Sequence, residues 1–300
     1  MPLQPNYLNS VNHYENFPVG SLLLPRKIRS KIIPFYNFAR TADDIADSNF
    51  LNSEKKIMLL NMFEDEITQS ANCRKAKDSM EMQVKLISKK LVTVLEDFQI
   101  NPHSVCELLN AFRLDSQFRP FCTWSELLKY CSYSANPVGR FLLAIVGLDT
   151  KVSFDKKVEL IRLSDKICTG LQLINFAQDI KEDTENNRCY VPKCGWPKPL
   201  NEANLTNICT LTQENKNRLV QELLKEGEQN LLAGMDLPKK VRKSNLQHAI
   251  RFSLEIALII ECGKNIVKQI KQNPSSVWSR APVLEIKKLP IFLYNAILNI

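Results

Sequence analysis

The chain has 300 residues, of which 44% are hydrophobic and 24% charged, and its formal net charge is +8. This composition is typical of a globular protein and excludes a disordered, collagen-like or low-complexity chain. No apolar stretch reaches the roughly 18 to 20 residues of a membrane-spanning helix. The first residues, MPLQPNYLNSVNHYENF, lack the apolar core of a secretory signal, so we expect a cytoplasmic protein.

The nine cysteines are odd in number, scattered and without a CxxC pair. This pattern predicts reduced thiols that fill core positions, in preference to a disulfide framework or a metal site.

Apolar residues recur every three or four positions along nearly the whole chain, which predicts an all-α fold. Glycine is scarce, and neither GxGxxG nor GxxxxGK[ST] occurs, so a Rossmann or P-loop phosphate site is unsupported. After an irregular lead-in over residues 1–24, helices are expected over residues 25–47, 53–70, 77–98, 102–117, 123–133, 137–146, 154–181, 212–232, 238–271 and 281–300. No repeat or linker divides the chain, which indicates one domain over residues 1–300.

The first chemically informative stretch is FYNFARTADDIAD, residues 35–47. Its apolar residues define an inward helical stripe, and Asp43, Asp44 and Asp47 lie beside that stripe. A carboxylate that faces a core is costly unless it has a partner. Several crowded oxygen ligands suit Mg²⁺, which shares its remaining positions between water and substrate phosphates.

A second acidic face follows at NFAQDIKED, where Asn175, Asp179 and Asp183 recur every four residues. Taken alone, either motif is compatible with a solvated helix surface. Two acidic faces in apolar surroundings instead favour a shared cation that offsets their repulsion. The sequence therefore predicts a metal-diphosphate site built from both motifs.

Such a site needs cations for the phosphate oxygens. The candidates are Arg40 on the first acidic helix, Arg140 after the Asn-Pro break at residues 136–137, and Arg188 shortly beyond Asp183, although any one arginine is by default a surface residue. Aromatic residues belong to the core by default, but in a cavity lined by helices their ring faces can stabilise a carbocation; the candidates are Phe35, Tyr36, Phe38, Tyr130, Tyr133, Phe176 and Tyr190. Of these, Tyr36, Tyr133 and Tyr190 are also candidates for positioning a water. The three histidines have no zinc-ligand spacing, and no GxSxG nucleophile elbow occurs.

At these residues the chain resembles the squalene/phytoene synthase family. The two family motifs match as residues 43–47 (DDIAD) and 179–183 (DIKED), followed by residues 187–192 (NRCYVP), and the resemblance extends from about His13 to Lys271. It implies an isoprenoid-synthase helical bundle around a central apolar cavity. It also implies Mg²⁺ as cofactor and an isoprenoid diphosphate as substrate.

Three segments resemble the hydroxysqualene synthase branch of that family: residues 15–19 (ENFPV), 38–47 (FARTADDIAD) and 130–140 (YCSYSANPVGR). This likeness implies that Asn16 joins the three arginines at the diphosphate, and that Mg²⁺ lies on the aspartates of both motifs and on Asn175. It further implies ionisation of presqualene diphosphate, rearrangement and capture of water in the squalene/hopanoid pathway, without NADPH.

Several alternatives stay open. A related head-to-head prenyl synthase would make presqualene diphosphate, squalene or phytoene, and a non-catalytic relative would act as an assembly factor. The basic run at residues 239–243 is either a solvated face or a contact with an anionic membrane surface, and residues 281–300 form either a core-packing helix or a helix lying on the membrane. No nucleic-acid groove is indicated, and the oligomeric state is not determined by the sequence.

Overall fold

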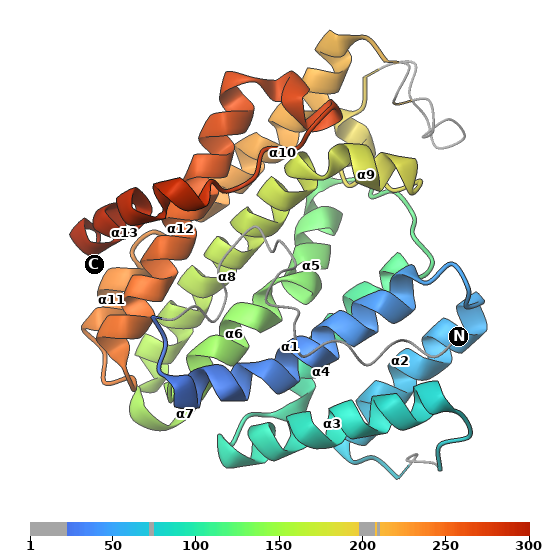
Figure 1. The fold of residues 1–300 in the computed structure, drawn as a ribbon, viewed down its shortest axis with the longest axis vertical. Helices are drawn as coiled ribbons and strands as arrows, with labels where there is room; N and C mark the ends of the chain where they lie inside the picture. The colour runs from blue at the N-terminus through green and yellow to red at the C-terminus, as the bar shows by residue number, and fades with distance from the viewer. Residues whose placement is uncertain (1–22, 72–74, 198–207, 209–210) are drawn as a thin grey trace.

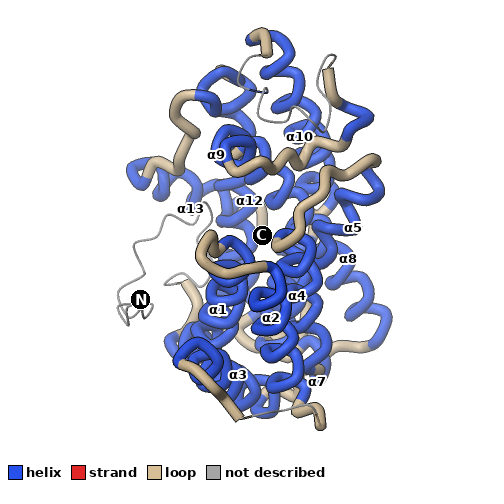
Figure 2. The backbone as a smooth tube through the Cα atoms, turned by 90° about the vertical axis from the view of Figure 1, so that its right-hand side faces the viewer, coloured by secondary structure: helices blue, strands red, loops and turns tan. Residues whose placement is uncertain are grey.

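The computed structural model describes residues 23–71, 75–197, 208 and 211–300, and every regular element within those ranges is helical (Figures 1 and 2). The predicted all-α fold is thus confirmed. The α-helices are α1 (Arg26–Asp47), α2 (Ser53–Thr68), α3 (Ser79–Asp97), α4 (Pro102–Asp115), α5 (Trp124–Ser134), α6 (Asn136–Ile145), α7 (Leu148–Lys151), α8 (Phe154–Gln178), α9 (Ile180–Glu185), α10 (Gln213–Ala233), α11 (Leu237–Arg242), α12 (Ala249–Gln272) and α13 (Leu289–Leu298). Short 3₁₀ turns are η2 (Lys193–Gly195), η4 (Pro274–Trp278) and η5 (Ile286–Lys288). Within the described part of the chain, no helix combines the length and apolar character that crossing a bilayer requires.

The main hydrophobic core runs continuously from α1 to α12, and a smaller cluster joins α12 to α13. The single-domain prediction also includes residues outside the described ranges, and it stays a prediction. All seven cysteines in the described ranges are free thiols. Four of them are buried, as predicted, whereas Cys122 and Cys194 are exposed.

Helix α1 carries the first acidic motif, and its inner face is apolar as the sequence predicts. Phe35 and Phe38 are buried, and the ring of Phe35 stacks on Phe141 of α6 with 4.0 Å between centroids. Phe38 meets Phe63 of α2 edge-on at 5.3 Å. These ring contacts fix the rotation of α1, and the aspartates beside the stripe are thereby fixed as well.

Side-chain caps define several helix starts. Asn101 Oδ1 accepts from the backbone N–H of His103, and Thr123 Oγ1 accepts from that of Glu126, as predicted. The sequence suggests Ser53 as the cap of α2, but in the structure the cap is Asn52, whose Oδ1 accepts from the N–H of Lys55 at 2.9 Å.

Three predicted helices are interrupted in the structure. The helix over 154–181 breaks at Asp179, which separates α8 from α9. The helix over 238–271 breaks between α11 and α12, because Gln247 donates its N–H to the Val146 carbonyl and His248 adopts a positive φ of 53°. The predicted helix over 281–300 is α-helical only in α13.

Helices α8 and α10 approach each other unusually closely, and glycine makes this possible. A Cβ added at Gly170 would lie 2.5 Å from the backbone nitrogen of Leu231, and one added at Gly227 would lie 3.1 Å from the Gly170 carbonyl oxygen. Backbone atoms cannot move aside as a flexible side chain can. The contact therefore fixes α8, which carries Asn175, against α10.

We expect Gly170→Ala to lower the free energy of unfolding by about 1–3 kcal/mol, because the added methyl overpacks this contact. Helix propensity alone would change stability in the opposite direction by about 1 kcal/mol. Thermal unfolding of the purified variant measures the effect. Gly195→Ala is the control, since its nearest neighbour is a Val191 side-chain carbon at 3.2 Å. A Gly170→Ala protein as stable as wild type would contradict the close contact.

Candidate metal-diphosphate site

The first motif lies on the last two turns of α1. Arg40 is paired there with two of the aspartates: its guanidinium lies 3.3 Å from Asp43 and 3.0 Å from Asp44. Burial raises the pKa of Asp43 to about 7; repulsion from Asp47 adds to the rise, and Arg40 opposes it. A carboxyl group in this state is half protonated near neutral pH, and a nearby cation would favour its ionised form.

The second motif spans the break between α8 and α9. Asn175 Nδ2 donates to Asp179 Oδ2 at 2.8 Å, which confirms that these two side chains share a face. Burial raises the pKa of Asp179 to about 6, with repulsion from Glu182 adding to the rise. Burial likewise raises the pKa of Asp183 to about 8, with Asp179 as the next cause. Both motifs thus hold carboxylates that lack compensation for their lost hydration.

Arg188 joins the two motifs. Its backbone N–H donates to the Asp183 carbonyl at 2.7 Å, after a residue of positive φ at Asn187, so the chain folds back over α9. Its guanidinium then reaches Asp47 of the first motif at 2.6 Å. Burial alone would lower the pKa of Arg188, but Tyr190, Asp47 and Asp115 more than offset that effect and raise it.

Asp115, at the end of α4, lies at the centre of this group and was missed by the sequence analysis. Tyr130 donates its hydroxyl to Asp115 Oδ2 at 2.7 Å, and Tyr190 donates to Oδ1 at 3.3 Å. Burial raises the pKa of Asp115 to about 6, while the Tyr130 hydrogen bond and Arg188 lower it. The charge of Asp115 in turn raises the pKa of both Asp43 and Asp183. This effect is the smallest named cause in both cases, and the contacts that link the two motifs are those of Arg188 with Asp47 and with the Asp183 carbonyl.

An aromatic cluster covers this centre. Phe176 of α8 stacks on Tyr190 with centroids 3.8 Å apart and planes 5° apart, and Tyr130 lies 5.7 Å from Tyr190. Phe118 and Phe121 complete the cluster. Stacked rings of this kind shield the hydroxyls of Tyr130 and Tyr190 from water and hold them on Asp115.

Other predicted site residues lie elsewhere or are not described. Tyr36 and Tyr133 are half-buried on α1 and α5, and they take no part in the ring contacts around Asp115 that are described above. Asn16 lies outside the described residues. Roles for these three residues stay predictions.

Arg140 of α6 lies in a separate ion-pair network. Its guanidinium forms two hydrogen bonds with Asp165 of α8, at 3.0 and 2.7 Å, and one with Glu107 of α4 at 2.8 Å. This geometry links three helices. The prediction that Arg140 contacts a diphosphate stays a prediction, and it requires the guanidinium to leave these carboxylates.

No three histidine, cysteine, aspartate or glutamate side chains in the described ranges are close enough to hold a metal ion by themselves. The donor chemistry nevertheless fits Mg²⁺, which accepts one or two carboxylates and completes its shell with water and phosphate oxygens. The raised pKa values of Asp43 and Asp183 support this fit, because a cation beside either carboxylate would offset its lost hydration and the repulsion from its neighbours. The predicted central apolar cavity stays a prediction: two hollows lined by described residues lie away from the motifs, one between α10 and α12 and one against α8.

Comparison with known proteins identifies the family of the chain. The squalene/phytoene synthase family model matches residues 11–287. The hydroxysqualene synthase of Rhodopseudomonas palustris is 36% identical over 180 residues, which cover 60% of this chain and 55% of that protein. The hydroxysqualene synthase of Sinorhizobium fredii is 33% identical over 186 residues, which cover 62% and 57%. The matched region thus spans little more than half the length of these curated relatives.

Solved structures share the fold. Squalene synthase HpnC from Alicyclobacillus acidocaldarius superposes with a TM-score of 0.67 at 24% identity, over 87% of this chain and 89% of that one. A dehydrosqualene synthase in complex with a ligand gives a TM-score of 0.66 at 17% identity, over 92% and 88%. With a family model that covers nearly its whole length, the chain belongs to the squalene/phytoene synthase family.

Proposed function

We propose that the protein is a hydroxysqualene synthase, which ionises presqualene diphosphate and captures the rearranged cation with water. The observation that carries the proposal is the convergence of both acidic motifs on Arg188 and Asp115. The similarity to relatives named hydroxysqualene synthase supports this branch of the family over the squalene and phytoene synthases.

Asp43, Asp47, Asn175, Asp179 and Asp183 would hold Mg²⁺, with Asp44 beside them. When bound, the metal supplies Lewis-acid stabilisation of the departing diphosphate. Arg40 and Arg188 lie next to the same carboxylates, so their guanidinium groups bind the remaining phosphate oxygens. Together these residues orient the leaving group and neutralise the charge that develops on it.

The residues around Asp115 act on the carbocation that remains after the diphosphate has left. Loss of diphosphate leaves a cyclopropylcarbinyl cation, which rearranges to an allylic cation. The ring faces of Phe176 and Tyr190 stabilise positive charge and exclude water until rearrangement is complete. Water then adds to the cation and releases a proton, which gives hydroxysqualene. The hydroxyls of Tyr130 and Tyr190 both donate to Asp115 and fix its position beside the aromatic cluster.

Product analysis tests the proposal. Purified protein supplied with presqualene diphosphate and Mg²⁺ is expected to yield hydroxysqualene and diphosphate without NADPH, because hydration of the cation requires no hydride. Parallel reactions use farnesyl diphosphate and geranylgeranyl diphosphate, each with and without NADPH. Turnover of farnesyl diphosphate alone, or squalene formation that requires NADPH, would assign the protein to a head-to-head prenyl synthase instead.

Substitutions in both motifs test the metal site. Asp43→Asn and Asp179→Asn are each expected to reduce turnover on the order of a hundredfold or more, because each removes a charged oxygen ligand but preserves the side-chain shape. Asp155→Asn, at an exposed position near the start of α8, is the matched control and is expected to retain full activity. Full turnover in both motif variants would contradict a catalytic metal site.

The pH dependence of stability provides a test without substrate. Asp43 and Asp183 have pKa values raised above those of the unfolded chain, so the native state binds more protons, and its stability falls as pH rises from about 4 to about 8. In the metal-free protein the melting temperature is expected to be lower at about pH 8.5 than at about pH 6. Adding Mg²⁺ with inorganic diphosphate should raise the melting temperature more at about pH 8.5 than at about pH 6.

The variant Asp183→Asn should flatten this decline, because asparagine does not titrate, whereas Asp155→Asn should leave it unchanged. Identical pH profiles for wild type and Asp183→Asn would contradict the raised pKa. Melting curves recorded in EDTA measure the metal-free state.

A further inference from the structure

The outer face of α13 is apolar, although α13 lies on the surface. The helix, LPIFLYNAIL, contains no charged residue. Phe292 and Ala296 point inward and are buried against Ala257, Leu258 and Cys262 of α12. The side of the helix away from these two residues exposes four large apolar side chains, Ile291, Tyr294, Ile297 and Leu298, and Leu289 is partly exposed in the first turn.

This pattern differs from that of an ordinary surface helix. Tyr294 and Leu298, one turn apart, are 63% and 65% exposed. A surface helix that packs only on its own protein presents polar or charged side chains to solvent. Scattered exposed apolar residues need no explanation, but a contiguous patch on one helix face marks an interaction surface.

Basic residues stand at both ends of this apolar face. Lys287 and Lys288 precede the first residue of α13. At the other end, Arg242 of α11 donates to the Ile300 carbonyl at 2.9 Å. Lys264 of α12 donates to Glu261 Oε1 at 2.7 Å, and Asn299 contacts that same oxygen at 3.5 Å.

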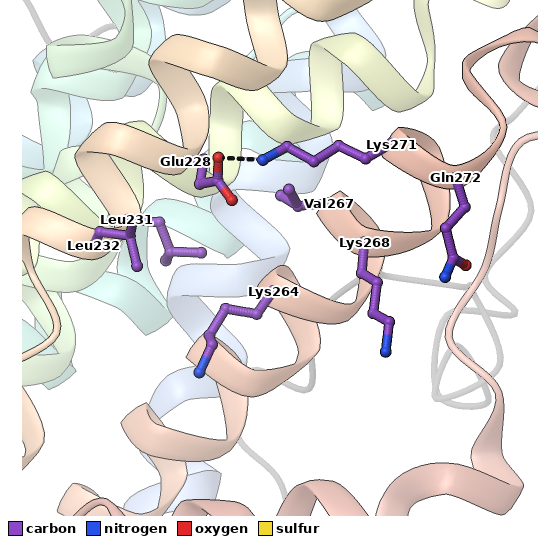
Figure 3. Close-up of a pocket in the computed structure, with 8 residues that line it drawn as sticks. All are labelled: Glu228, Leu231, Leu232, Lys264, Val267, Lys268, Lys271 and Gln272. Atoms are coloured by element: carbon purple, nitrogen blue, oxygen red, sulfur yellow. Dashed lines mark hydrogen bonds and ion pairs between the residues drawn. The ribbon is translucent and has the colours of Figure 1, made fainter.

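The neighbouring surface of α12 continues the basic character. A groove of about 420 Å³ between α10 and α12 is lined by Lys264, Lys268 and Lys271 over an apolar floor (Figure 3). Lys271 reaches across the groove to Glu228 at 2.5 Å, whereas Lys264 and Lys268 extend away from that ion pair.

The carboxylates in contact with the basic rim of α13 are Glu261 and Glu285, the latter paired with Lys288 at 2.6 Å. Lys287, Lys288, Arg242 and Lys264 outnumber these two, so the rim is net positive.

We propose that α13 docks the protein on the surface of an anionic lipid bilayer, with Tyr294 and Leu298 inserted at the headgroup boundary and the lysines at the phosphates. An apolar helix face with cationic flanks has the chemistry of interfacial helices, since apolar burial and attraction to anionic lipid add together. A second copy of this chain is a poorer occupant. Any pairing of the face with itself brings the cationic end of one copy against a cationic end of the other.

Vesicle binding tests the proposal independently of the reaction, because no substrate is present. The full chain is sedimented with vesicles of phosphatidylcholine alone and with vesicles that also contain phosphatidylglycerol. Binding is expected to the anionic vesicles and to be much weaker to the neutral ones. Tyr294→Ser/Leu298→Ser is expected to lower the affinity for anionic vesicles roughly tenfold, through lost apolar burial.

Matched controls come from α3. Met82→Ser/Leu86→Ser removes two exposed apolar side chains one turn apart, and it should not change binding. Lys287→Gln/Lys288→Gln should reduce the preference for anionic vesicles roughly tenfold or more, whereas Lys89→Gln/Lys90→Gln should not. Melting curves confirm that each variant is folded.

Three outcomes would overturn the proposal. They are equal binding to both vesicle types, equal effects of the α13 and α3 variants, and a wild-type dimer that Tyr294→Ser/Leu298→Ser converts to monomer. The last would assign the face to self-association.

Discussion

The structure depends on one electrostatic constraint: several carboxylates lie close to one another and have lost their hydration on burial. Asp43, Asp115 and Asp183 come from α1, α4 and α9, and burial raises the pKa of each. Arg188 is the cation that ties them together, through its ion pair with Asp47 and its effect on the pKa of Asp115 and Asp183. Arg188 and Arg40, which pairs with Asp43 and Asp44, together do not offset this much negative charge, so the site is electrostatically incomplete without further cations. Under the proposed function, that incompleteness is the physical reason for a divalent metal at this place, and the metal in turn offsets the charge of the diphosphate.

The rest of the fold holds the two acidic helices in place. Ring contacts of Phe35 and Phe38 fix α1, and the glycine contact at Gly170 fixes α8 against α10. Arg140 adds a polar link among α4, α6 and α8. These contacts are rigid and distant from the aspartates. Their packing energy therefore offsets the electrostatic cost of placing the carboxylates close together.

The sequence predicted those parts of the site that have a periodic signal. Asp43 and Asp47, and likewise Asn175 and Asp179, stand four residues apart on apolar helices, so their shared faces could be read directly. Asp115 could not be found in this way, because a single carboxylate at a helix end has no pattern, and its partners Tyr130 and Tyr190 come from other segments. The environment of Arg140 was missed for the same reason, since it depends on Asp165 and Glu107. The breaks at Asp179 and before α12 reflect tertiary contacts, which override helical periodicity.

The ion pair between Arg188 and Asp47 has a consequence for turnover. In the structure the Arg188 guanidinium is paired with the Asp47 carboxylate. Under the proposed function, an arriving diphosphate therefore replaces Asp47 as the partner of this guanidinium. The exchange frees Asp47 to turn toward a metal at the moment when phosphate oxygens replace it on the arginine. After the reaction, Asp47 can reclaim Arg188 and displace the spent pyrophosphate. Under the proposed function, the same short contact makes Asp47 a competitor of the diphosphate for Arg188 both when substrate binds and when pyrophosphate leaves.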